Sequence, residues 1–248
     1  MRIALARLGV LGLLLVLWSW AAASMPPGLF ASPMQTWDAA GRMLAEGRLI
    51  QATVASLQVY LSGVGLAAIA GIAIGGLMGA VPPVGRTLDI FVNALAATPR
   101  VAFVPLIIVL MGLGLQAKVF IVFLGALMPI ILNSCAGVRA ADRELIEMAR
   151  SFGASRWRIL TQVILPGAVP FILTGLRIGA TIGLINTVVA ELYTAVTGLG
   201  GLLATYGASF RMAEYFVVVL TLSLIGVCVT EGLRMIETRL GRWSRAGH

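Results

Sequence analysis

Residues 144–166 read ELIEMARSFGASRWRILTQVILP, a charged passage between two long hydrophobic stretches. Its first apolar residues recur at helical spacing: Leu145, Met148, Ala149 and Phe152. This spacing predicts an amphipathic helix of about three turns. Gly153 can adopt the left-handed turn that ends a helix, and Ser155 is suited to cap a second one. The second helix is expected to continue until Pro166 stops or kinks it.

The chain around this passage has the composition of a membrane protein. Of its 248 residues, 59% are hydrophobic and 11% are charged, whereas soluble domains are about 45–50% apolar and about 25% charged. The net charge of +8 does not indicate a nucleic-acid partner, because the bases lie in short segments between apolar stretches. The single histidine is the last residue, so no Cys/His cluster predicts a metal site.

Six stretches are apolar enough to cross a bilayer as helices, for which about 20 residues are needed. They cover residues 8–23, 54–80, 90–111, 119–138, 168–190 and 215–234. The predicted fold class is therefore all-α integral membrane, with residues 1–248 as one transmembrane domain and residues 139–166 as a loop between the fourth and fifth spans. The first span could instead be a cleaved signal peptide. We favour a retained helix because five further spans follow.

The basic residues give the orientation of the six spans. The side that holds both termini carries twelve of them: Arg2, Arg7, Arg86, Arg139, Arg143, Arg150, Arg156, Arg158, Arg234, Arg239, Arg242 and Arg245. The opposite side carries four: Arg42, Arg48, Lys118 and Arg211. Because cytoplasmic loops are enriched in Lys and Arg, this bias predicts cytoplasmic termini and a cytoplasmic loop at 139–166.

Two of the spans carry rows of glycine four residues apart. The rows are Gly71, Gly75 and Gly79 in the second span, and Gly175, Gly179 and Gly183 in the fifth. This spacing places the glycines on one helix face, where another helix can approach closely, either within the chain or in a dimer. On the outer side, residues 36–47 are expected to form a short surface helix.

Polar residues close to membrane depth are candidates for a translocation path: Asn93, Thr98, Arg100, Asn133, Asn186 and Glu191. Pro99 and Pro105 interrupt the third span, and broken helix at this depth is tolerated only against protein or a water-filled cavity. Ionisable residues inside a membrane are functional candidates by default. Arg100 and Glu191 have an alternative interpretation, in which they lie at the membrane surface and extend into water.

The sequence contains no Walker A motif, so any nucleotide energy must come from another polypeptide. A secondary transporter would be expected to bury charges at mid-membrane and often to show inverted repeats. An intramembrane enzyme would need paired acids, a histidine cluster or a nucleophile with its base. Neither pattern is clear here. The amphipathic passage has three possible placements on physical grounds: the lipid surface, the protein's own cytoplasmic ends, or a groove on a partner.

The same passage resembles the EAA motif of bacterial ABC-importer permeases, E-A-A-x3-G-x9-I-x-L-P. The matching residues are Glu147, Met148, Ala149, Gly153, Val163, Leu165 and Pro166. Met148 and Val163 depart from the usual alanine and isoleucine. The stretches TPRVAFVPLIIVLMGLG, GALMPIILNSCAGVRAAD and VVAELYTAVTGLGGLL are similar to segments of the sulfonate, taurine and nitrate branch of these permeases. The likeness covers nearly the whole chain and is weakest over residues 1–50.

This resemblance implies a type I ABC-importer permease in the bacterial inner membrane, itself not an enzyme, that moves a small organic anion into the cytoplasm. It implies a homodimer within membrane lipid, a cytoplasmic ATPase dimer that holds ATP and Mg, and a periplasmic substrate-binding protein. No cofactor is implied on this chain. Residues 139–166, called the coupling loop below, would bind the ATPase. Its coupling residues would be Glu147, Met148, Ala149, Phe152, Gly153, Leu165 and Pro166.

Overall fold

The computed structural model of the protein describes residues 2–26, 28–195 and 197–244, and this part of the chain is helical and contains no strand. The N-terminal half holds α1 (Arg2–Ser24), α2 (Pro33–Ala45), α3 (Arg48–Ala80), α4 (Pro82–Ala97), the 3-10 helix η1 (Arg100–Phe103) and α5 (Val104–Met111). The C-terminal half holds α6 (Leu115–Arg139), α7 (Arg143–Ser151), α8 (Arg156–Ile159), the π-helical segment η2 (Leu160–Ile164), α9 (Leu165–Thr194), α10 (Gly198–Ala208) and α11 (Met212–Ser244).

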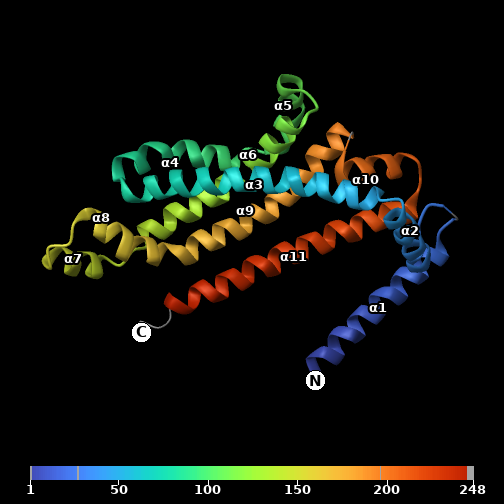
Figure 1. Cartoon of the computed structure of the whole chain (residues 1–248), viewed down its shortest axis with the longest axis horizontal. Helices are drawn as coiled ribbons and strands as arrows, with labels where there is room; N and C mark the ends of the chain where they lie inside the picture. The colour runs from blue at the N-terminus through green and yellow to red at the C-terminus, as the bar shows by residue number, and fades with distance from the viewer. Residues whose placement is uncertain (1, 27, 196, 245–248) are drawn as a thin grey trace.

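The long helices α3, α6, α9 and α11 run along the longest axis of the molecule, with α6 packed between α3 and α9 (Figure 1). The short helices α7 and α8 lie at one end of this axis, and α2 and α10 lie at the other (Figure 1). These are called the α7–α8 end and the α2–α10 end below. Five helices in the described ranges are long and apolar enough to cross a membrane, and the bent pair formed by α4 and η1–α5 makes six spans if counted as one.

The third span is broken at Pro99, where the sequence places an interruption, but it begins earlier than predicted and is not interrupted at Pro105. The sequence predicts one span over residues 90–111, whereas the structure has α4 from Pro82 to Ala97 and a second helical piece from Arg100 to Met111, bent by 82°. Thr98 has extended backbone angles, as expected for a residue that precedes a proline, and Pro99 supplies no N–H to continue the helix. The chain therefore changes direction at this dipeptide.

Both glycine rows pack against helices of the same chain, which resolves the alternative left open by the sequence. A Cβ added to Gly75 of α3 would overlap the backbone oxygen of Ile131 on α6, and one added to Gly71 would lie 2.7 Å from Ile130 Cγ2. On α9, a Cβ at Gly179 would lie 2.8 Å from Ile130 Cγ1. The missing side chains thus let both α3 and α9 approach α6 closely around Ile130, and this three-helix contact forms the core.

The helix expected over residues 36–47 is present as α2, which begins earlier, at Pro33. Ser32 explains the earlier start, because it accepts from Gln35 N–H while the Gln35 side chain accepts from Ser32 N–H. Pro33 then occupies the first helical position, where a missing N–H costs nothing.

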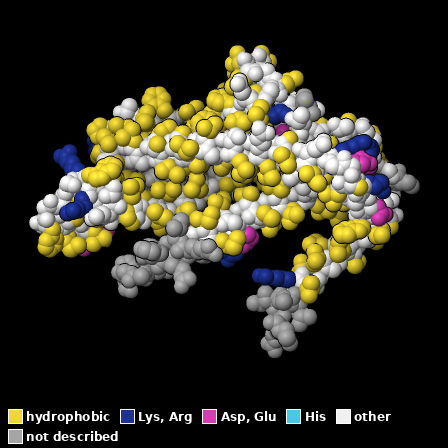
Figure 2. All heavy atoms as spheres, viewed as in Figure 1, with side chains coloured by type: hydrophobic (Ala, Val, Ile, Leu, Met, Phe, Trp, Pro, Cys, Tyr) yellow, Lys and Arg dark blue, Asp and Glu magenta, His cyan; other side chains and the backbone are white. Residues whose placement is uncertain are grey.

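Hydrophobic side chains cover the middle of the molecule in Figure 2, and charged side chains gather mainly toward its two ends. Helix α1 contributes strongly to this apolar surface, since its described side chains from residue 6 to residue 24 are exposed or half-buried. Trp18 ties α1 to the bundle, with its indole N–H donating to Ala31 O at 2.9 Å and its ring lying 5.4 Å from that of Phe216. An apolar belt between charged ends is the surface expected of a membrane-embedded bundle.

Candidate functional site

Two capped short helices form the coupling loop at the α7–α8 end. The Asp142 carboxylate caps α7 by accepting from Glu144 N–H at 2.8 Å and from Leu145 N–H at 3.4 Å. Ser155 caps α8 in the same way, accepting from Arg158 N–H at 3.3 Å. Helix α7 ends with Gly153 in the left-handed region, at φ 75°. The helix–turn–helix and the roles of Gly153 and Ser155 are as the sequence predicts.

Two hydrogen bonds close the turn after α7. Gly153 N–H donates to Arg150 O at 2.9 Å, and Ala154 N–H donates to Ala149 O at 3.0 Å. This pair is the Schellman arrangement, in which a left-handed residue lets the chain reverse while the last carbonyls of the helix stay satisfied. A Cβ at Gly153 would meet nothing within 4 Å, so the requirement for glycine here comes from the backbone angle and not from crowding.

Leu145 and Met148 of α7, together with its C-cap residue Phe152, point away from the rest of the chain, whereas Ile146 is half-buried. Leu145, Met148 and Phe152 are all exposed, and Phe152 is 86% accessible. Glu147 is also exposed and Ala149 is half-buried, so the EAA-like residues form part of an uncovered helix surface. No residue of α7 is buried. Among the described parts of the chain, no segment covers this face.

The coupling loop continues into a membrane span without a break. The sequence predicts that Pro166 stops or kinks the second helix; it does not stop it, since residues 156–194 form one helix of 39 residues. Residues 160–164 adopt π-helical geometry, and Leu165 N–H donates to Leu160 O, five residues back. This widened turn precedes Pro166, where the missing N–H would otherwise interrupt the α-helical pattern. Leu165 and Pro166 are exposed on this joint.

Arg100 lies at the break in the third span and contacts α6. Its guanidinium donates to Gly125 O at 3.0 Å and to Ala96 O at 3.2 Å. Gly125 O is available because Pro129, four residues later in α6, has no N–H to donate to it. The Arg100 Nε is buried and has no hydrogen-bond partner among the described residues. The guanidinium is therefore held by protein and is not extended into water.

Asn186 of α9 approaches the same turn of α6, since a Cβ at Gly125 would overlap the Asn186 amide. The structure thus brings Arg100 and Asn186 together around Gly125. The remaining candidates of α4 and α6 make hydrogen bonds of their own or are exposed. Asn133 is half-buried and bonds within α6, to Pro129 O at 2.8 Å, whereas Asn93 is exposed on α4 and Thr98 bonds to Ala94 O at 2.8 Å.

Glu191 is buried near the α2–α10 end, with 1% of its surface accessible. Ser56 of α3 places its Oγ 2.9 Å from Oε1 and 2.8 Å from Oε2, and Gly200 N–H of α10 donates to Oε2 at 2.9 Å. Leu199 N–H in turn donates to Ser56 Oγ at 2.8 Å. The alternative in which Glu191 extends into water at the membrane surface is therefore wrong, because both of its oxygens are bound inside the protein.

Lys118, which the sequence places on the outer side, lies in the first turn of α6, is only 3% accessible and donates to Thr197 Oγ1 at 2.9 Å. Ser56, Lys118 and Thr197 were not singled out by sequence reasoning. Ser56 carries no sequence signal beyond being a small polar residue in an apolar helix. Lys118 could have been recognised, since its cationic side chain directly precedes an apolar stretch that the structure buries.

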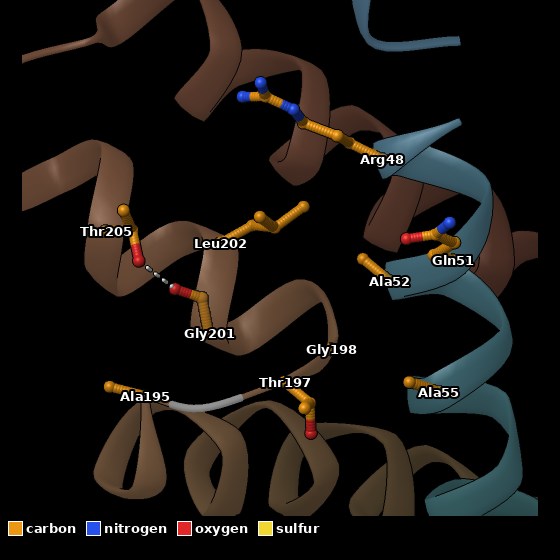
Figure 3. Close-up of a pocket in the computed structure, with 10 residues that line it drawn as sticks. All are labelled: Arg48, Gln51, Ala52, Ala55, Ala195, Thr197, Gly198, Gly201, Leu202 and Thr205. Atoms are coloured by element: carbon orange, nitrogen blue, oxygen red, sulfur yellow. Dashed lines mark hydrogen bonds between the residues drawn. The ribbon is translucent and has the colours of Figure 1, made fainter. Parts of the chain in front are cut away.

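A hollow of about 280 Å³ lies beside this junction, between the first turns of α3 and helix α10 (Figure 3). Its polar lining includes Gln51 from α3 and Thr197 and Thr205 from the other wall. Arg48, at its edge, is paired with Glu46 at 2.9 Å. Within the described ranges, no group of three or more His, Cys, Asp or Glu side chains could hold a metal ion.

Comparison with known proteins connects these features to a family. Residues 63–242 match the family described as binding-protein-dependent transport system inner membrane component. A taurine transport system permease protein of Escherichia coli is 32% identical over 244 residues, which covers 95% of this chain and 88% of that protein. A putative ABC transporter permease protein of Methanocaldococcus jannaschii is 36% identical over 204 residues, covering 82% and 76%.

A putative aliphatic sulfonates transport permease protein of E. coli is 37% identical over 164 residues, covering 66% of this chain and 62% of that protein. Among solved structures, the MetNI methionine ABC transporter in an inward-facing conformation superposes with a TM-score of 0.68 at 20% identity, covering 79% of this chain and 97% of that one. The fold is thus that of an ABC-importer permease. The chain belongs to the family of binding-protein-dependent inner membrane components of ABC importers, in the branch of the sulfonate, taurine and nitrate permeases.

Proposed function

We propose that this permease subunit works as a homodimer that moves a small organic anion, of the sulfonate, taurine or nitrate kind, from periplasm to cytoplasm by alternating access. A separate cytoplasmic ATPase dimer, which holds ATP and Mg, binds the coupling loop, and a periplasmic binding protein delivers the substrate at the other end. The α7–α8 end and both termini face the cytoplasm of a bacterial cell.

The observation that carries this proposal is the uncovered apolar face of α7. Leu145, Met148 and Phe152 stay exposed on a helix held rigidly by its cap and by the turn at Gly153. Lipid-surface helices are rich in Lys and Arg on their polar face. Helix α7 instead carries two acids, Glu144 and Glu147, beside its two arginines. A groove on a protein partner fits this balanced polar face better than an anionic membrane does.

The coupling residues have distinct positions on this surface. Met148 and Phe152 are exposed and available to insert into the ATPase groove. Glu147 next to Met148 is also exposed, and Ala149 is half-buried. Gly153 sets the angle between α7 and α8. Leu165 and Pro166 follow the π-helical joint that connects α8 to the span. Movement of the bound ATPase would thereby displace α9 as a packed body.

The third span supports a path between two copies. Asn93 is an exposed polar side chain in the otherwise apolar second half of α4, residues 90–97. Neighbouring α5 stands away from the bundle (Figure 1), with Val109 and Leu110 largely uncovered. A second copy facing this region would cover the apolar side chains of α5. The same arrangement would place Asn93, Thr98 and Arg100 near the axis between the copies, with Asn133, Asn186 and Glu191 deeper in each bundle.

An anionic substrate is supported by the charge at this break and by the relatives. Arg100 is the cation held there, and its Nε has no described partner. The two E. coli relatives named above are described as a taurine permease and a putative aliphatic sulfonates permease. A further relative from Leptolyngbya laminosa, 31% identical over 186 residues, is described as a nitrate import permease. Sulfonate and nitrate share a delocalised negative charge that a guanidinium can bind.

Co-purification with the ATPase tests the proposal. Phe152→Asp is expected to abolish capture of the ATPase by the tagged permease, because it places a charge in the apolar contact. Leu44→Asp, a matched change of an exposed apolar residue on α2 at the opposite end, is expected to leave capture unchanged. Equal capture by both variants would overturn the docking assignment. A C-terminal fluorescent-protein fusion tests the orientation, since it should fluoresce only with a cytoplasmic C-terminus.

A further inference from the structure

The carboxylate of Glu191 joins three helices at the end of the molecule opposite the coupling loop. We propose that Glu191 is a positioning residue that clamps the ends of α3, α9 and α10 into one body, so that displacement of the coupling loop reaches the hollow beside α10. This inference rests on the proposed function, because it assumes that an ATPase moves the coupling loop.

The first step is the mechanical continuity of α8, η2 and α9. Residues 156–194 form one helix that begins next to the turn at Gly153 and ends one turn beyond Glu191. The same element therefore carries the coupling loop at one end of the long axis and the clamp toward the other (Figure 1). A rigid helix transmits translation or rotation along its length if its far end is bound to its neighbours.

The second step is the number of bonds at that far end. Glu191 receives hydrogen bonds from Ser56 on α3 and from Gly200 N–H in the first turn of α10, while Ser56 also receives one from Leu199 N–H. Lys118 of α6 adds a further hydrogen bond, to Thr197 just before α10. All these donors and acceptors converge on the start of α10, which is the wall of the hollow in Figure 3.

The third step is the absence of free space at the contact. A Cβ at Gly198 would overlap the Glu191 carboxylate, and one at Gly200 would lie 2.6 Å from Glu191 Cβ. Gly198 also has φ 88°, which favours glycine. Helix α10 thus fits directly on Glu191 and has little room to slide independently of α9.

The fourth step separates a clamp from a role in substrate passage. The lining of the hollow does not include Glu191, and both carboxylate oxygens are occupied by donors from the protein. A clamp needs acceptor atoms in these positions, whereas a path residue that repels or binds charged substrate needs the charge. Gln at this position would retain an acceptor for Gly200 N–H and Ser56 while removing the charge.

The test compares Glu191→Gln, Glu191→Ala and Ser56→Ala in the complete transporter, reconstituted with its ATPase and binding protein. We expect uptake of a labelled sulfonate by Glu191→Gln to stay within about twofold of the unchanged protein, and uptake by Glu191→Ala and Ser56→Ala to fall about tenfold or more. ATPase capture should be unchanged in all three. Equal loss in Glu191→Gln and Glu191→Ala would overturn the clamp in favour of a charge role.

A second readout follows motion at the two ends, which a purely structural role in folding would not alter selectively. Spin labels on Ser151→Cys report the coupling loop, and labels on Thr205→Cys report the hollow, each measured between the two copies after replacing the exposed Cys228 with serine. In the unchanged protein, ATP should shift both distances. In Ser56→Ala, and in Glu191→Ala if it assembles, ATP should shift the distance between the labels at residue 151 and leave the distance between the labels at residue 205 unchanged.

A Thr205 distance that still responds to ATP in Ser56→Ala would overturn the clamp while leaving the proposed function intact. A Ser151 distance that ignores ATP in the unchanged protein would instead overturn the proposed function and, with it, the motion that the clamp transmits. Ser56→Ala removes one hydroxyl and leaves the Glu191 side chain in place, so it serves the test even where Glu191→Ala does not assemble.

Discussion

Replacement of Gly153 by valine is a direct test of the turn in the coupling loop. Gly153 has φ 75°, and a Cβ there would meet no atom within 4 Å. The added Cβ therefore causes no collision, and the expected cost comes from the left-handed backbone. That conformation costs an L-residue about 1–2 kcal/mol, and a β-branched residue is an outlier there.

The expected magnitude follows from this cost. If the ATPase binds only the turn as seen in the structure, about 1–2 kcal/mol lowers the population of that geometry by about 5–30-fold. The apparent Kd for the ATPase should rise by the same factor, because only the competent fraction binds. Gly153→Asn, a matched variant that tolerates left-handed geometry, should bind within about threefold of the unchanged protein.

The assay is titration of labelled ATPase against permease variants in nanodiscs, with membrane insertion checked by yield and by gel filtration. The expected order of affinity is glycine, asparagine, alanine and then valine. Normal binding by Gly153→Val would refute the reasoning. Equal weakening by asparagine and valine would also refute it, since it would show that the partner contacts the bare glycine backbone and not a turn geometry.

Three further predictions concern packing and the break in the third span. Gly75→Val should destabilise the bundle by about 1–3 kcal/mol, because its side chain meets α6. Gly76→Val on the same helix faces open space and should cost about 1 kcal/mol or less. Thermal unfolding in detergent measures both costs. Arg100→Gln should lower anion uptake in proteoliposomes about tenfold without changing ATPase capture, and unchanged uptake would remove Arg100 from the path. Pro129→Ala restores an N–H that competes with Arg100 for Gly125 O, so it should lower anion uptake by a smaller factor than Arg100→Gln does. An effect as large as that of Arg100→Gln would point to a distorted α6.

The coupling loop was the part best predicted from the sequence, because its structure depends on local chemistry. The helical spacing of the α7 residues, a glycine for the left-handed turn and a serine cap at residue 155 each act within a few residues of chain. The prediction for Pro166 was less successful. Proline removes one donor, but the sequence does not reveal that a π-helical turn ahead of it would let the helix continue.

The arrangement across the bundle depends on contacts between distant residues, and sequence spacing does not identify the partners. Glycine rows marked two packing faces, but only the structure shows that both meet α6. Polar residues were recognised singly, yet Arg100 depends on Pro129 of another helix for a free acceptor. Glu191 was given a possible surface position because Ser56, 135 residues away in sequence, could not be recognised as its partner.

Cross-linking from α7 to the ATPase tests the central claim most directly. A photoreactive amino acid is placed at residue 152 or, as a control at the opposite end, at residue 44, and membranes containing permease and ATPase are irradiated. The structure predicts a cross-link to the ATPase from position 152 and none from position 44, because Phe152 is exposed on the coupling loop and Leu44 on α2. If position 152 gave only lipid adducts while the ATPase cross-linked elsewhere, α7 would not be the docking surface.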